Sequence, residues 1–220
     1  MKWLNSLDEL LYEVMSWLLF FPLTLWRAIR EPLRLMAEVE QQTGLPDEEQ
    51  YGTILSPPLF LALSLLLAHA GATALGQSDA LIANKKGLAS LVDDNATALV
   101  VRVVVFAGFA LFLAARLVRS RDVVLSRVTL RQPFYEQCYP SAVLALGLSV
   151  GTSLTLVQHG PTHAAGRILA IASLAYFLIV EVRWFAVARN ISNLRALGHV
   201  ALATSEAMIL MLFTGFLFTR

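Results

Sequence analysis

Five charged or titratable side chains lie within long apolar stretches of the sequence: Arg102, Glu181, Arg183, His199 and Glu206. The stretch LATSEAMILMLF surrounds Glu206 with apolar residues almost completely. A carboxylate at the centre of a bilayer costs roughly 2.5 to 3.5 kcal/mol, so such a residue needs a reason to be there. The set could conduct or bind an ion, a proton or a small solute. It could equally pair between helices and fix their register. The residue types leave both interpretations open.

The depth of each residue along its run indicates which of them could meet. We expect Glu206 to face the interior of a bundle, as a neutral acid unless a cation is near. Arg102 is its obvious partner by charge, although the helix rise separates the two by about 10 Å along the membrane normal. Glu181 is expected nearer the cytoplasmic side of the membrane than Glu206, at the depth of His199.

Three histidines are predicted at the opposite, outer face: His69, His159 and His163. The last two belong to HGPTH, and a spacing of four can bring two imidazoles onto one metal ion if the segment is helical. Gly160 and Pro161 argue against a regular helix there, and no acidic or cysteine ligand accompanies the pair. We therefore expect exposed loop histidines, no metal site and no cofactor.

A small-residue face is present in GLSVG, where Gly147 and Gly151 form a GxxxG pattern that Ser149 extends. Such faces let two helix backbones approach closely. The pattern predicts close packing, either at the centre of a bundle or in a dimer. Cys138, the only cysteine, excludes an intrachain disulfide. We expect it to be a buried thiol, with acylation as the alternative.

Composition decides what kind of molecule must position these residues. The chain has 220 residues, of which 57% are hydrophobic and 15% charged, and its mean hydropathy is +0.64. Soluble proteins carry about 25% charged residues, so this chain lacks the polar surface of a soluble domain. A net charge of +1 gives no basic footprint for nucleic acid. No nucleotide-binding loop, nucleophile elbow or HExxH is present, so we expect a membrane protein that is not an enzyme.

Long apolar runs predict where the chain crosses the bilayer. About 20 helical residues span its hydrocarbon core, whereas a membrane β-barrel would show alternating segments of about 10. The sequence predicts an all-α integral membrane protein, with a five-helix transmembrane bundle over residues 51–220. The expected spans are Ile54–Leu75, Ala96–Val118, Tyr139–Val157, Ala164–Ala188 and Leu197–Phe218.

The lysines and arginines predict the orientation of these spans. Twelve lysines and arginines precede the first span, lie between the second and third spans, or lie between the fourth and fifth. Four lie on the opposite side of the membrane, and Arg102 lies within a span. The N-terminus is therefore expected in the cytoplasm and the C-terminus outside. In a bacterial cell this is a multi-pass protein of the inner (plasma) membrane with a periplasmic C-terminus.

Residues 1–50 are predicted to form a cytoplasmic arm. Ser6 and Glu9 fit a capping box at the start of an amphipathic helix, and Pro22 is expected to break it before it could span. The helix would lie in the membrane interface, with this apolar stripe: Leu7, Leu10, Leu11, Val14, Met15, Leu18, Phe21 and Leu25.

Basic residues follow the stripe in WRAIREPLRLMAEVE. Arg27, Arg30 and Arg34 lie on one predicted face, with expected i,i+4 pairs Arg27–Glu31 and Arg34–Glu38. The face could dock anionic lipid or a partner protein, or the helix could simply pack on the bundle. Both interpretations remain open.

Two segments carry a family resemblance: FFPLTLWRAIREP, and VTLRQPFYEQCYPSAVLALGL before the third span. With the order of a cytoplasmic arm and five spans, the chain resembles the bacterial branch of the Yip-type membrane family, named for proteins that interact with Ypt/Rab GTPases. The Asp-Leu-Tyr-Gly-Pro segment of the eukaryotic members is absent. The resemblance implies a non-enzymatic five-helix module in membrane organisation, trafficking or transport.

These patterns lead to one leading expectation and one alternative. The leading one is a membrane-organising, trafficking-like or accessory protein in the lipid bilayer that self-associates or binds a membrane-protein partner. The alternative is a small permease-like transporter or channel that uses Arg102, Glu181 and Glu206.

Overall fold

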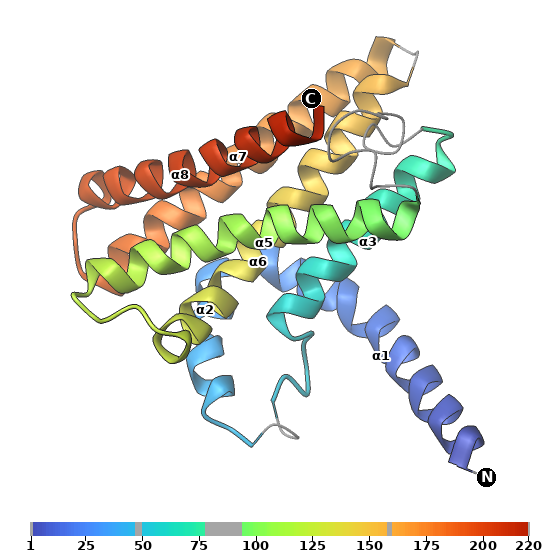
Figure 1. Cartoon of the computed structure of the whole chain (residues 1–220), viewed down its shortest axis with the longest axis horizontal. Coiled ribbons are helices and arrows are strands. Elements are labelled where there is room, and N and C mark those ends of the chain that lie inside the picture. Colours follow the sequence, from blue (N-terminus) through green and yellow to red (C-terminus); the bar gives the residue numbers. More distant parts are fainter. Residues whose placement is uncertain (1, 47–49, 78–93, 158–159, 220) are drawn as a thin grey trace.

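The computed structural model describes residues 2–46, 50–77, 94–157 and 160–219, and over these residues the chain is helical with connecting turns (Figure 1). The helices are α1 (Lys2–Arg30), α2 (Pro32–Thr43), α3 (Pro57–Ala74), α5 (Asn95–Ser120), α6 (Arg127–Leu156), α7 (Gly160–Arg189) and α8 (Asn193–Thr219). Five of the described helices, α3 and α5 to α8, are long and apolar enough to cross a membrane. The predicted all-α bundle with five spans is confirmed.

Local signals define where the spans begin. Pro57 occupies the first turn of α3, where its missing N–H costs no hydrogen bond. The Asp94 carboxylate caps α5 by accepting the backbone N–H of Thr97 at 2.7 Å. This hydrogen bond lowers the pKa of Asp94 below its usual range.

Span boundaries differ from the predicted ones, most clearly where the helices extend into the connections. α6 begins at Arg127, not at Tyr139, since Ser126 and Thr129 form a capping box there. The helix then continues through Pro133 and Pro140, which membrane helices tolerate when neighbours satisfy the freed backbone groups. The HGPTH prediction was also wrong: α7 begins at Gly160, so Pro161 lies in its first turn.

The N-terminal helix is longer than predicted at both ends. α1 begins at Lys2, before the predicted start at Ser6, and Pro22 lies inside it and does not end it. The chain turns instead at Glu31, which has φ −133° and ψ 50°, immediately before Pro32. Proline disfavours helical geometry in the residue before it, which explains the position of this corner.

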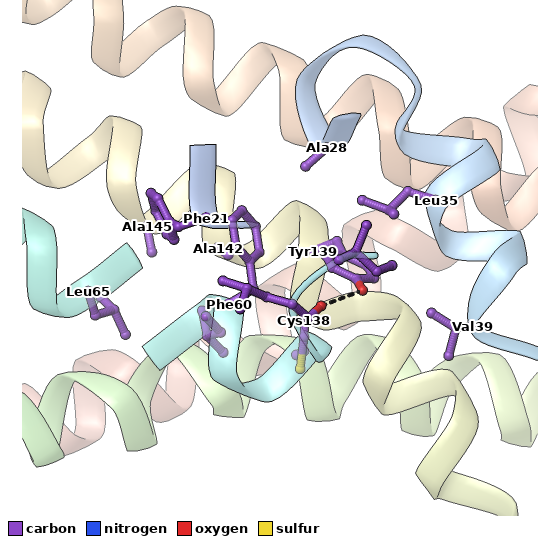
Figure 2. Packing of buried hydrophobic residues seen from close by; sticks show 14 residues of the cluster. Phe21, Ala28, Leu35, Val39, Phe60, Leu65, Cys138, Tyr139, Ala142 and Ala145 are labelled. Atoms are coloured by element: carbon purple, nitrogen blue, oxygen red, sulfur yellow. Dashed lines mark hydrogen bonds between the residues drawn. The ribbon is translucent and has the colours of Figure 1, made fainter. Parts of the chain in front are cut away.

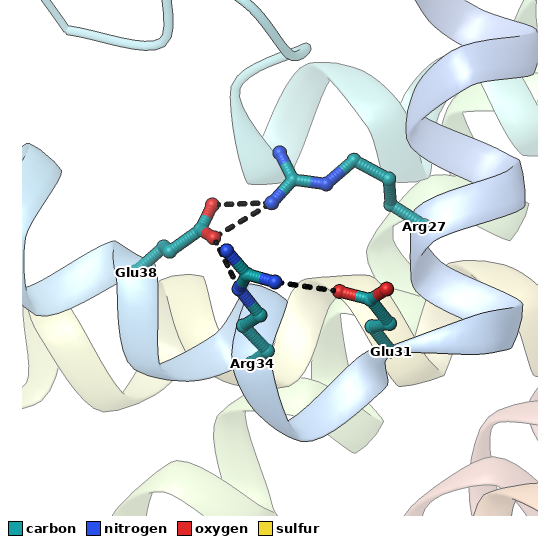
Figure 3. Close-up of polar contacts among 4 residues, drawn as sticks. All are labelled: Arg27, Glu31, Arg34 and Glu38. Atoms are coloured by element: carbon teal, nitrogen blue, oxygen red, sulfur yellow. Dashed lines mark hydrogen bonds and ion pairs between the residues drawn. The ribbon is translucent and has the colours of Figure 1, made fainter.

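The corner between α1 and α2 reorganises the predicted ion pairs (Figure 3). Arg27 reaches across it and places one guanidinium nitrogen 2.7 Å from both carboxylate oxygens of Glu38. The predicted pair Arg27–Glu31 is therefore wrong. The predicted Arg34–Glu38 pair is present at 3.5 Å, and Arg34 also lies 3.3 Å from Glu31.

α6 is the central helix and packs against α1, α2, α3, α5 and α7. One hydrophobic cluster joins it to both arm helices and to α3 (Figure 2). The residues at the centre of this cluster are Phe21, Leu35, Phe60, Tyr139 and Ala142. The predicted arm, residues 1–50, and the predicted bundle thus share one core.

Backbone groups of the connection into α3 are held by two buried hydroxyls. Thr24 accepts the N–H of Leu55 at 3.0 Å, and Tyr139 donates to the carbonyl of Leu55 at 3.0 Å. A third hydroxyl, on Tyr176 of α7, donates to the carbonyl of Ala28. These bonds satisfy backbone groups inside the bundle and fix the base of α1 to it.

The small-residue face of α6 is used within the chain, against α7. A Cβ added to Gly147 would lie 1.9 Å from the Ser173 hydroxyl, and one added to Gly151 would lie 2.8 Å from the carbonyl oxygen of Gly166. Ser149 is half-buried beside them. The sequence left open whether GLSVG packs inside the bundle or in a dimer. In the structure it packs inside the bundle.

Candidate functional site

The predicted polar residues do not gather into one track. Arg102 lies with one guanidinium nitrogen 3.1 Å from Nδ1 of His69, between α5 and α3. The expectation that His69 is an exposed loop histidine was wrong, because its side chain is buried with 8% exposure. No ion pair joins Arg102 to Glu206, although both belong to the described part of the chain.

Glu206 is only partly buried. It lies at the edge of the stripe of α8 that contains the buried residues Ala203 and Ala207. The structure therefore places it at the edge of the buried face of α8 and not fully in the bundle interior as expected. The reason is that α8 is apolar on all sides, so the sequence pattern did not define its buried face.

The remaining predicted positions are dispersed. Arg183 is exposed on α7, and His199 on α8 is half-buried near the positive charges of Arg116 and Arg189. His163 is exposed in the first turn of α7, while His159 lies outside the described residues. Within the described residues, no three side chains of His, Cys, Asp or Glu gather as metal ligands would.

Glu181 is the exception, because it occupies a buried polar cluster between α6 and α7. Its side chain has 0% exposure, and the neighbouring Glu136 of α6 has 2%. Gln137 of α6 faces Glu181, and Trp184 of α7 faces Glu136. We name Glu136, Gln137, Glu181 and Trp184 the carboxyl cluster.

Most polar atoms of the carboxyl cluster lack hydrogen-bond partners. One oxygen of Glu136 accepts from the Gln132 amide at 3.0 Å. The other Glu136 oxygen, both Glu181 oxygens, both amide atoms of Gln137 and the Trp184 indole nitrogen have none. Facing groups therefore lie close without aligned hydrogen bonds. Buried groups of this kind are costly unless paired, which marks the cluster as a candidate functional site.

The surrounding packing explains how these residues come together. The antiparallel contact of Gly147 with Ser173, further along the interface, sets α6 and α7 in a register that brings position 137 beside 181. The second hydrophobic cluster closes around them, with Met36 of α2 inside it at 0% exposure. The amphipathic arm therefore packs on both helices that carry the carboxyl cluster, and Met36 shares a hydrophobic cluster with Trp184.

Sequence reasoning identified Glu181 but missed its neighbours on α6. Glu136 and Gln137 precede the apolar run, so the prediction assigned them to a connection. A signal was nevertheless present: Gln132 and Glu136 are four residues apart in QPFYEQCYP, the spacing of side chains that meet on one helix face.

The predicted docking arginines have mainly internal roles. Arg27 and Arg34 pair with Glu38 and Glu31 at the corner. Arg30 lies over the Trp26 ring, with its guanidinium carbon 4.5 Å from the ring centroid. The basic face is therefore largely neutralised within the chain. Cys138 is buried, as expected for a structural thiol.

Comparisons with protein-family models, with curated proteins and with solved structures gave no match for this chain. The resemblance to the Yip-type family therefore stays a hypothesis.

Proposed function

We propose that this polytopic membrane protein is a non-enzymatic membrane-organising or accessory protein, which acts through its amphipathic arm at the cytoplasmic interface of the membrane. The arm would insert its apolar stripe among lipid headgroups or beneath a membrane-protein partner. The five spans would anchor it and fix its direction.

The observation that carries this proposal is the exposed apolar surface of α1. Figure 1 shows its N-terminal part extending away from the bundle. Leu11, Met15, Leu18 and Leu19 on this part are each more than half exposed. An exposed stripe of this kind marks a surface that binds lipid or protein.

The rigid base of α1 supports a mechanical role. The Arg27–Glu38 pair, the Thr24–Leu55 bond and the Tyr176–Ala28 bond hold its C-terminal end on the bundle. A force on the arm is therefore transmitted to α6 and α7. Self-association, where it occurs, would use a surface other than Gly147 and Gly151, since α7 already covers them.

The transporter alternative has less support. Of the three residues that motivated it, Arg102 lies beside His69 and Glu206 is only partly buried. Only Glu181 occupies the interior between helices. A solute path across three spans would need other residues than the predicted ones.

Photo-crosslinking from the arm tests the proposed role. A photoreactive side chain is placed at Leu11 or Leu18 of α1 in the full chain in native membranes, with Leu45 after α2 as the matched position. All three are exposed in the structure. We expect Leu11 and Leu18 to crosslink to lipid or to one defined membrane protein, and Leu45 to do neither. Arm positions that behave like Leu45 would show a water-exposed helix and overturn the proposal.

A further inference from the structure

We propose that Glu181 and Gln137 form a proton-binding site inside the α6–α7 interface, where Glu181 is held as a neutral acid. This inference is independent of the role proposed for the arm. The ligand is a single proton, which forms an O–H bond with one Glu181 carboxylate oxygen and removes one negative charge from the interface.

The first argument is the absence of a compensating charge. Glu181 is completely buried, and no ion pair involves it among the residues that the structure describes. An ionised carboxylate in such a place would be strongly unfavourable without a cation. A bound proton removes this cost.

The second argument is the hydrogen-bonding capacity of the facing groups. Both oxygens of Glu181 and both amide atoms of Gln137 are unpartnered. A carboxylate could accept from the Gln137 NH₂ group, but it would leave the amide oxygen without a donor. A neutral carboxyl accepts from the NH₂ group and donates its O–H to the amide oxygen. Only the protonated form of Glu181 therefore satisfies this pair completely.

Glu136 differs from Glu181 in its surroundings. One of its oxygens accepts from the Gln132 amide at 3.0 Å, and the Trp184 indole N–H lies near its carboxyl group. These donors can serve either form of Glu136, whose burial at 2% exposure opposes ionisation as it does for Glu181. Whenever Glu136 is ionised, its negative charge disfavours a second charge on Glu181. The amide of Gln137, which offers both a donor and an acceptor, is the partner of Glu181 and not of Glu136.

The charged groups around the site leave Glu181 without a compensating cation. Arg121, after α5, and Glu40 of α2 act on Glu136 with opposite signs. Tyr176 of α7 interacts electrostatically with Glu181, and its hydroxyl already donates to Ala28. From α6, Gln137 and Glu136 act on Glu181. No cation among the described residues forms an ion pair with Glu181.

Infrared spectroscopy of the full chain in lipid vesicles tests the proposal, because a neutral carboxyl absorbs separately from a carboxylate. At pH 7 we expect a neutral-acid component that shifts in heavy water and disappears in Glu181→Gln. It should remain in Glu136→Gln. Glu206→Gln, which changes a partly exposed carboxyl in the membrane, is the matched control and should leave this component unchanged. The amide absorption in the same spectra reports whether each variant retains its helices.

A second variant checks the partner. Gln137→Leu should shift the same component to higher frequency, since the carboxyl loses the hydrogen bond from the amide. The proposal is overturned if wild-type protein shows no neutral-acid component that Glu181→Gln removes, or if Glu136→Gln removes it instead. An unchanged frequency in Gln137→Leu would overturn the assignment of Gln137.

Discussion

Gly151 allows the backbones of α6 and α7 to pack closely against each other. A Cβ at this position would lie 2.8 Å from the Gly166 carbonyl oxygen and 3.0 Å from the Ala170 nitrogen, both of which belong to a rigid helix backbone. We expect Gly151→Ala to lower the free energy of unfolding by about 1 to 3 kcal/mol through overpacking. The measurement is denaturant unfolding in detergent or lipid.

Gly198 in α8 is the matched control, because a Cβ there meets nothing within 4 Å. Gly198→Ala should be neutral or stabilising by up to about 1 kcal/mol, since alanine favours the helix. Equal losses in both variants would show that helix geometry, and not the α6–α7 contact, responds to the change.

Glu206 provides a second test at this scale. Its side chain is partly exposed and makes no hydrogen bond or ion pair with the described residues. We therefore expect Glu206→Leu to give a folded yield in membranes at or above that of wild type and of Glu206→Gln, because it removes a polar group facing lipid. Glu206→Lys should give the lowest yield. If Leu instead lowers the yield, Glu206 has buried partners whose loss costs about 1 to 3 kcal/mol.

Single residues differ in how far their roles could be predicted. The spacing of Gly147 and Gly151 predicted close packing, because only small residues permit it, but not which helix they meet. Glu181 was identified by its charge within an apolar run. Gln137 carries no charge and precedes the run, so its contact with Glu181 follows only from the α6–α7 register.

At the scale of elements, the corner at Glu31 sets the direction of the arm. Arg27 and Glu38 join α1 to α2 across it, and each side chain is about one quarter exposed (25% and 24%). A double-mutant cycle with Arg27→Ala and Glu38→Ala should give a coupling free energy of roughly 0.5 to 3 kcal/mol. Unfolding measurements on the two single variants and the double variant supply it.

Arg34 and Glu31 form the control pair on the same segment, with side chains 71% and 52% exposed. Solvent screening should limit their coupling to roughly 0 to 1 kcal/mol. A coupling for Arg34–Glu31 that equals or exceeds that of Arg27–Glu38 would mean that the corner is not held by the cross-helix pair.

The elements show where prediction from the sequence succeeds and where it fails. Span number followed from the length of the apolar runs, because the thickness of the bilayer fixes the length required. Span ends did not follow, since a capping box at Ser126 starts α6 well before its apolar part. Pro22 was expected to break the arm helix but lies inside α1, whereas the chain turns before Pro32.

In the whole molecule, three parts act together. The five spans form the bundle, the arm is proposed to lie at its cytoplasmic face, and the carboxyl cluster lies between α6 and α7, near Met36 of the arm, which shares a hydrophobic cluster with Trp184. This arrangement depends on the number of spans and on the side on which the arm lies. The basic residues of the connections predict that side.

Topology reporters test the number of spans and the side on which the arm lies. Fusions after Gln42, Gln77, Arg127, Gly160 and Arg195, and at the C-terminus, sample the arm, each connection and the end of the chain. We expect them to read cytoplasmic, outside, cytoplasmic, outside, cytoplasmic and outside. A cytoplasmic reading at the C-terminus would contradict the five spans, and an outside reading after Gln42 would place the arm on the wrong face of the membrane.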